Sequence, residues 1–167
     1  MPDVKLTENL MKALQYEWRI YQELLKLAEK KTDVLVRHDT AQLSALTEEE
    51  GKLAEQSKQL ARVREQYAAK LNEALGLAAN ASLEEAEKLL SEPQAAQLAD
   101  IRARLKETVM QLMLRNGINQ KLIENALEYI NFNLELMAGP APEASVYGKS
   151  GTEISTGGKR SMLDIRY

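Results

Sequence analysis

Apolar residues recur at steps of three and four along residues 93–137, the longest regular stretch of the chain. The average step is about 3.6 residues, the period of an α-helix. Ser91 with Gln94 fits a capping box at the start, and Gly139 with Pro140 ends the pattern. We therefore predict one helix over residues 92–137, which needs long partner helices. Its stripe consists of Ile101, Leu105, Val109, Leu112, Asn116, Asn119, Ile123, Leu127, Ile130, Leu134 and Met137.

Asn116 and Asn119 interrupt this otherwise apolar stripe. A buried amide that lacks a hydrogen-bond partner costs about 1–3 kcal/mol, so both side chains need partners. One interpretation is that they bond to a neighbouring helix and set its alignment, as a polar residue does in a coiled-coil core. The other interpretation is that they mark the place where another protein is bound.

Two further amphipathic stretches precede this helix, and they predict helices over residues 4–37 and 40–75. Asp39 with Gln42 fits a cap for the second of them. The connection is so short that the two helices should form an antiparallel hairpin.

The second helix carries a half-formed heptad pattern. Leucine or another apolar residue recurs at intervals of seven, at Leu46, Leu53, Leu60, Tyr67 and Ala74. The neighbouring register is mixed, because it contains Glu50, Ser57 and Arg64. These polar residues either form the solvated edge of the seam or bond across to the two asparagines of the last helix.

Ser82 and Glu85 form a capping box for a short helix over residues 82–90. A helix of this length needs packing against the rest of the fold, because it is not stable alone. The predicted fold is all-α: an elongated antiparallel helical bundle of three long helices and one short helix, with a flexible C-terminal tail.

The composition changes at residue 138. Five of the eight glycines and two of the four prolines fall in the last thirty residues. We predict a helical bundle domain over residues 1–137 and a flexible tail over residues 138–167. Apolar groups inside the tail either fold back on the bundle or become ordered when a partner binds. They are Val146, Tyr147, Met162, Leu163 and Ile165.

Composition and charge exclude several classes of function. The formal net charge of −3 argues against a general nucleic-acid binder, which should be basic. The chain has no cysteine and a single histidine, His38, so thiol catalysis, thiolate metal sites and hydrolase triads cannot be built within it. We expect no enzyme activity, no cofactor and no metal site. The N-terminus lacks a signal-peptide pattern, and no apolar run is long enough for a membrane span, so we expect a cytoplasmic protein.

The order of these parts resembles the FlgN-type flagellar export chaperones. The likeness rests on the hairpin at His38-Asp39, on Asn116-x-x-Asn119-x-x-Leu122-Ile123 in the last helix, and on Tyr147-Gly148-x-x-Gly151 after it. Glu50, Leu53, Leu60 and Arg64 of the second helix also fit. The resemblance implies a non-enzymatic cytoplasmic chaperone. Such a protein holds hook-filament junction (hook-associated) proteins and delivers them to the type III flagellar export gate. The SMLDIRY end matches no motif of that family.

A long helical surface suits this role, because it can cover the apolar terminal helix of a secretion client by helix-in-groove packing. The alternative class is a structural coiled-coil or rod component of a secretion apparatus, with no client. We expect the partner-binding residues to be Asn116, Asn119, Leu122, Ile123, Ile130, Leu134, Tyr147, Gly148, Gly151, Met162, Leu163 and Ile165.

Overall fold

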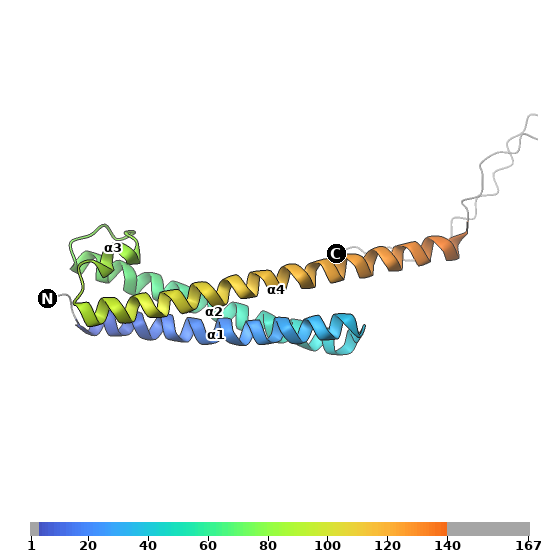
Figure 1. The fold of residues 1–167 in the computed structure, drawn as a ribbon, viewed down its shortest axis with the longest axis horizontal. Helices are drawn as coiled ribbons and strands as arrows, with labels where there is room; N and C mark the ends of the chain where they lie inside the picture. Colours follow the sequence, from blue (N-terminus) through green and yellow to red (C-terminus); the bar gives the residue numbers. More distant parts are fainter. Residues whose placement is uncertain (1–3, 140–167) are drawn as a thin grey trace, which may run out of the picture. The chain divides into compact units, whose positions relative to one another are not determined.

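The structure, a computed structural model, describes residues 4–139, which form four helices. They are α1 (Val4–Val36), α2 (Thr40–Ala74), α3 (Leu83–Glu87) and α4 (Glu92–Ala138), shown in Figure 1. No strand occurs within this described range. The predicted all-α fold of three long helices and one short helix is confirmed. The predictions for the tail lie outside the described residues.

The chain divides into two compact units, Met1–Ala126 and Leu127–Tyr167, and each is described by itself. The first unit contains α1, α2, α3 and most of α4. The described part of the second unit is the last stretch of α4, from residue 127 to residue 138, followed by Gly139. The domain boundary expected at residue 138 stays a prediction.

Side-chain caps fix the helix ends much as the sequence predicts. Asp39 accepts a hydrogen bond from the Gln42 backbone N–H at 3.0 Å, so the cap of α2 is confirmed. The turn before it needs His38 in the left-handed region, with φ at 56°. Ser82 and Glu85 make the expected capping box of α3.

One predicted helix end and one predicted cap are wrong in detail. The helix α3 stops at Glu87 rather than at residue 90, because Leu89 and Leu90 donate to carbonyls only three residues back and the helical spacing tightens. At the start of α4, the Ser91 hydroxyl donates to the Gln94 side chain at 2.8 Å. That bond replaces the reciprocal side-chain-to-backbone bonds of a capping box.

The interface between α1 and α2 contains polar contacts as well as apolar ones. Arg64 Nε lies 2.9 Å from Glu17 Oε2, and Lys31 forms an ion pair with Glu50. Ser57, midway between the two charged residues of α2, is buried. Neither expectation for Glu50, Ser57 and Arg64 was right: the two charged residues pair with α1 rather than with the asparagines of α4.

The helix α4 lies parallel to α1 within the first unit. Trp18 Nε1 donates to Thr108 Oγ1 at 3.1 Å, and Asn119 Nδ2 donates to the Ala28 carbonyl at 2.8 Å. These contacts join residues 90 and 91 positions apart, so α1 and α4 advance together. At this nearly constant separation, Val36 at the end of α1 lies level with Ala126.

The apolar core of the first unit gathers near α3. Its buried members are Leu10, Leu14, Leu71, Leu98 and Ile101, which come from α1, α2 and α4. The adjacent loop is held by Asn72, a fully buried side chain that donates to the Ala79 and Ala81 carbonyls. Arg102 of α4 pairs with Glu84 and Glu87 and so ties α3 to the bundle. Burial of these apolar side chains stabilises the end of the bundle near α3.

The buried Glu17 predicts a pH dependence of stability. Burial raises the pKa of Glu17 above 4.5, and the nearby Arg64 offsets only part of that rise. A carboxyl group whose pKa is higher in the folded than in the unfolded state stabilises the fold at low pH. This stabilisation is fully present below the unfolded-state pKa and is lost as the pH rises through the folded-state pKa. We expect the unfolding free energy of the wild type, minus that of Glu17→Gln, to fall as the pH is raised from acid to neutral.

Urea denaturation across this pH range measures the difference. Glu48→Gln is the control, because a hydrogen bond from Lys52 lowers the pKa of the exposed Glu48 and gives its contribution the opposite sign. A wild-type-minus-Glu17→Gln difference that rises with pH would contradict the prediction.

Candidate partner-binding surface

The face of α4 that contacts the bundle follows a heptad repeat. Most of its buried and half-buried residues alternate steps of three and four, the 3.5-residue period of a coiled-coil seam, and the half-buried Arg102 and Val109 lie beside this line. The residues of the seam are Leu98, Ile101, Leu105, Thr108, Leu112, Arg115, Asn119, Leu122 and Ala126. The seam is therefore apolar with three polar members, Thr108, Arg115 and Asn119.

This seam corrects the stripe that the sequence predicted. A stripe that averages about 3.6 residues drifts by roughly 20° per heptad from a 3.5-residue seam. From Val109 onwards, every second residue of the predicted stripe lies off the seam. From Ile123 onwards, none of the stripe residues lies on the seam. Asn116 and Ile123 are exposed, whereas Asn119 and Leu122 lie on the seam. The predicted stripe thus crosses from the bundle interface to a neighbouring, uncovered face.

Asn119 is buried and has hydrogen-bond partners on α1. Its amide nitrogen donates to the Ala28 carbonyl at 2.8 Å, and its amide oxygen accepts from the Thr32 hydroxyl at 2.7 Å. Only 3% of the residue is exposed. In this arrangement Asn119 aligns α4 with α1, and a role toward another protein stays a prediction.

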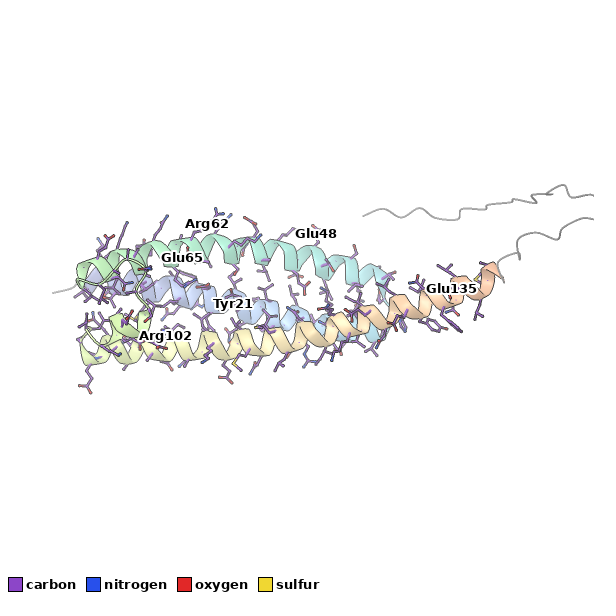
Figure 2. The ribbon with its side chains drawn as sticks, turned by 90° about the horizontal axis from the view of Figure 1, so that it is seen from above. Tyr21, Glu48, Arg62, Glu65, Arg102 and Glu135 are labelled. Carbon is purple, nitrogen blue, oxygen red and sulfur yellow. The ribbon has the colours of Figure 1, made fainter. Side chains whose placement is uncertain are left out.

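Asn116 instead lines an open groove of the first unit. The groove has a volume of about 600 Å³, and Leu24 and Lys31 of α1 lie between its two sides. The α2 side carries Glu50 and Ala54, and the α4 side carries Leu112, Asn116, Asn119, Gln120, Ile123 and Glu124. Figure 2 shows the arrangement: α1 (blue) passes between α2 (green) and the first part of α4 (yellow), and Tyr21 lies between them.

The last stretch of α4, residues 127–138, is an uncovered apolar helix, which we call the end segment. Leu127, Ile130 and Leu134 are 55%, 50% and 53% exposed, and Met137 is 85% exposed. These four follow steps of three and four along one face. Tyr129, Phe132 and Leu136 are also exposed on its other sides. The only charged residues of the end segment are Glu128 and Glu135. A helix that is apolar on nearly all sides normally lies buried, so this surface calls for a partner.

The structure separates the predicted partner-binding residues into distinct environments. Asn119 and Leu122 face the bundle, Asn116 and Ile123 face the groove side, and Ile130 and Leu134 are exposed on the end segment. The other six, Tyr147, Gly148, Gly151, Met162, Leu163 and Ile165, lie outside the described residues. The prediction omitted Tyr129, Phe132 and Leu136 because it considered a single face. The absence of lysine and arginine from residues 122–138 is the sequence signal that indicates an all-round apolar surface.

The described residues offer no metal centre and no membrane span. Between residues 4 and 139, no group of three or more His, Cys, Asp or Glu side chains is placed to hold a metal ion. None of the helices in this range combines the length and apolarity needed to cross a bilayer. The feature that remains is the uncovered apolar surface of α4.

A helical bundle with an uncovered apolar helix is the architecture of a protein that binds other proteins through helix packing. The model of the family described as FlgN protein matches residues 1–154. The chain belongs to the FlgN family, and this membership indicates a flagellar export chaperone. No curated protein and no solved structure matches the chain.

The different environments of the two asparagines predict different effects of substitution. Asn119→Leu removes two buried hydrogen bonds and should lower the free energy of unfolding by about 1–3 kcal/mol. Asn116→Leu changes an exposed residue and should stay within about 0.5 kcal/mol of the wild type. Urea denaturation of the two variants and the wild type measures these changes in the free energy of unfolding. Equal losses in both variants would show that Asn119 does not hold α4 in the way described.

Proposed function

We propose that this chain is a cytoplasmic export chaperone that binds hook-filament junction proteins and delivers them to the type III export apparatus of the flagellum. Family membership supports the chaperone role. The observation that carries the client-binding part is the uncovered apolar surface of the end segment. We assign no catalytic step and no cofactor to this function.

The client surface is the face of the end segment that carries Leu127, Ile130, Leu134 and Met137. Each of these side chains is at least half exposed. Full burial of a side chain of this size contributes about 1.5–3 kcal/mol. A client helix laid along this face covers all four side chains with no energy source other than burial. Such packing also hides the apolar helix of the client, which would otherwise associate before export.

The charge of the end segment narrows the chemistry of the client. Glu128 and Glu135 are its only charged residues, and they lie seven positions apart, near one line along the helix. At about 100° per residue, this line runs on nearly the opposite side of the helix from the client face. The client face itself therefore carries no charge and favours an apolar client helix.

The groove of the first unit offers a second place for client contact. Asn116 and Ile123 lie on its α4 side, and Asn116 is exposed and able to bond to the backbone or side chains of a client. This is the role that we propose for Asn116. Leu122 and Asn119 support the groove from the seam.

Residues of the tail complete the proposal. Tyr147, Gly148 and Gly151 are part of the family resemblance, and we propose that they contact the export gate. Met162, Leu163 and Ile165 are proposed to contact client or gate. The family model ends at residue 154, so it supports only the first group.

Substitutions on the end segment test the client surface. Ile130→Asp and Leu134→Asp place a charge where an apolar client helix should lie, and each should weaken binding about ten- to hundredfold. Asn125→Asp is the matched control, since it adds the same charge to an exposed position whose spacing from Leu127 and Ile130 puts it on the other side of the helix. The measurement is a titration with the C-terminal helix of a hook-filament junction protein from the organism that encodes the chain.

The outcomes of this titration separate the chaperone from a structural rod protein. No binding by the wild-type chain would favour the rod component. Binding that all three variants weaken equally would show that charge, rather than apolar contact, governs the interaction. In either case the end segment would not be the client surface.

Removal of the tail tests how much the tail contributes to client binding and delivery. A chain that ends at Ala138 should bind the client helix more weakly or fail in delivery, while the thermal stability of the bundle stays nearly unchanged. Thermal unfolding and the same titration measure both properties. Tighter binding by the shortened chain would mean that the tail covers the client surface instead. Equal binding would leave the tail with the export gate alone.

A further inference from the structure

A second uncovered apolar face lies on α4 within the first unit, away from the groove. Met110, Leu114 and Ile118 are 55%, 71% and 47% exposed, although they belong to the part of α4 that packs on α1. Leu114 is two positions from the seam residue Leu112, and about 100° per residue carries it to the far side of the helix. We call Met110, Leu114, Gly117 and Ile118 the outer patch.

Leu114 is the centre of a symmetric pattern. Apolar residues lie at equal distances on its two sides, and charged residues at equal distances have opposite signs. Four positions before it lies Met110 and four positions after it lies Ile118. Seven positions away on the two sides lie Glu107 and Lys121. Steps of four and seven keep these residues on one face of a helix. At equal distances from Leu114, an apolar residue is therefore matched by an apolar residue, and a charged residue is matched by a residue of the opposite charge.

We propose that the outer patch binds a second copy of this chain, with the two α4 helices antiparallel and a two-fold axis passing beside Leu114. In this arrangement Met110 of one copy meets Ile118 of the other. Glu107 of each copy faces Lys121 of the other, which gives two equivalent ion pairs. A parallel arrangement would place Glu107 against Glu107 and Lys121 against Lys121. The charge pattern therefore selects the antiparallel pair.

Gly117 supports a close approach of a second helix to this face. Glycine in a helix interior is less favourable than alanine, so its presence requires a reason. Apart from its neighbours and the backbone of its own helix turn, no atom of the described residues lies within 4 Å of the position where a Cβ at residue 117 would stand. Packing within the chain therefore does not require glycine here, whereas a helix crossing this face would approach most closely at a residue without a side chain.

The outer patch is separate from the surface assigned to the client. The client face belongs to the end segment, residues 127–138. Within the first unit, the groove residue Ile123 lies on the α2-facing side of α4, whereas Leu114 and Ile118 lie on the opposite side of its seam. The interface involves few side chains, and we expect a reversible dimer whose population rises with concentration. Self-association and client binding then use different residues of α4.

Charge exchange tests this dimer in the full-length chain. Sedimentation equilibrium over a range of concentrations should show association of the wild type. Glu107→Lys alone and Lys121→Glu alone each set like charges against one another at two places and should weaken the dimer about tenfold. The combined Glu107→Lys and Lys121→Glu variant restores opposite charges and should return the affinity to near that of the wild type. Far-ultraviolet circular dichroism verifies that each variant keeps its helices.

Glu55→Lys is the matched control, because it reverses an exposed charge on α2, away from α4. It should leave the dimer unchanged. A second variant, Leu114→Arg, places two like charges beside the two-fold axis and should abolish association.

Three results would overturn the proposal. The first is a wild-type chain that stays monomeric at every concentration. The second is a dimer that survives Leu114→Arg, since its interface must then lie elsewhere. The third is a combined charge-exchange variant as weak as the single variants, since Glu107 and Lys121 would then not face each other. Loss of client-helix binding in the single variants, without change in association, would assign the outer patch to the client.

Discussion

The hydrogen bonds of Asn119 to Ala28 and Thr32 are the contacts on which the arrangement of α4 depends. The apolar members of the α4 seam are aliphatic side chains that pack acceptably in more than one alignment, because packing of such groups is not directional. An amide buried to 3% exposure finds its partners in only one alignment. That alignment determines which side of α4 lines the groove and which side carries the outer patch.

Much of the fold was accessible from the sequence because it is encoded locally. Asp39 and Ser82 are caps whose partners lie three residues away, so the helix starts follow from short-range pattern alone. The choice between the two roles of Asn119 was not accessible in the same way. Its partners on α1 are 87 and 91 residues away, and only the packed fold brings them together.

The register of α4 was harder still to predict from the sequence. Apolar residues occur on nearly every side of α4, so a helical period selects a plausible stripe without showing which side is covered. The difference between 3.5 and 3.6 residues per turn is small over one heptad, yet over five heptads it carries the stripe across the helix. Residues such as Leu122 and Ile123 are adjacent and both apolar, and only contact with α1 distinguishes them. For the same reason, the sequence pattern did not predict the outer patch or the exposure of Tyr129 and Phe132.

The two ion pairs of the α1–α2 hairpin also act against wrongly folded hairpins. Glu17 and Lys31 are fourteen residues apart on α1, and their partners Arg64 and Glu50 are fourteen residues apart on α2. If α2 slipped by two heptads in one direction, Glu17 would meet Glu50. The opposite slip would bring Lys31 against Arg64. In both misaligned hairpins the apolar seams still coincide, since a heptad repeat is unchanged by whole-heptad shifts. Like charges in a largely buried interface are costly, so these residues reject the misfolded forms that the apolar pattern by itself would allow.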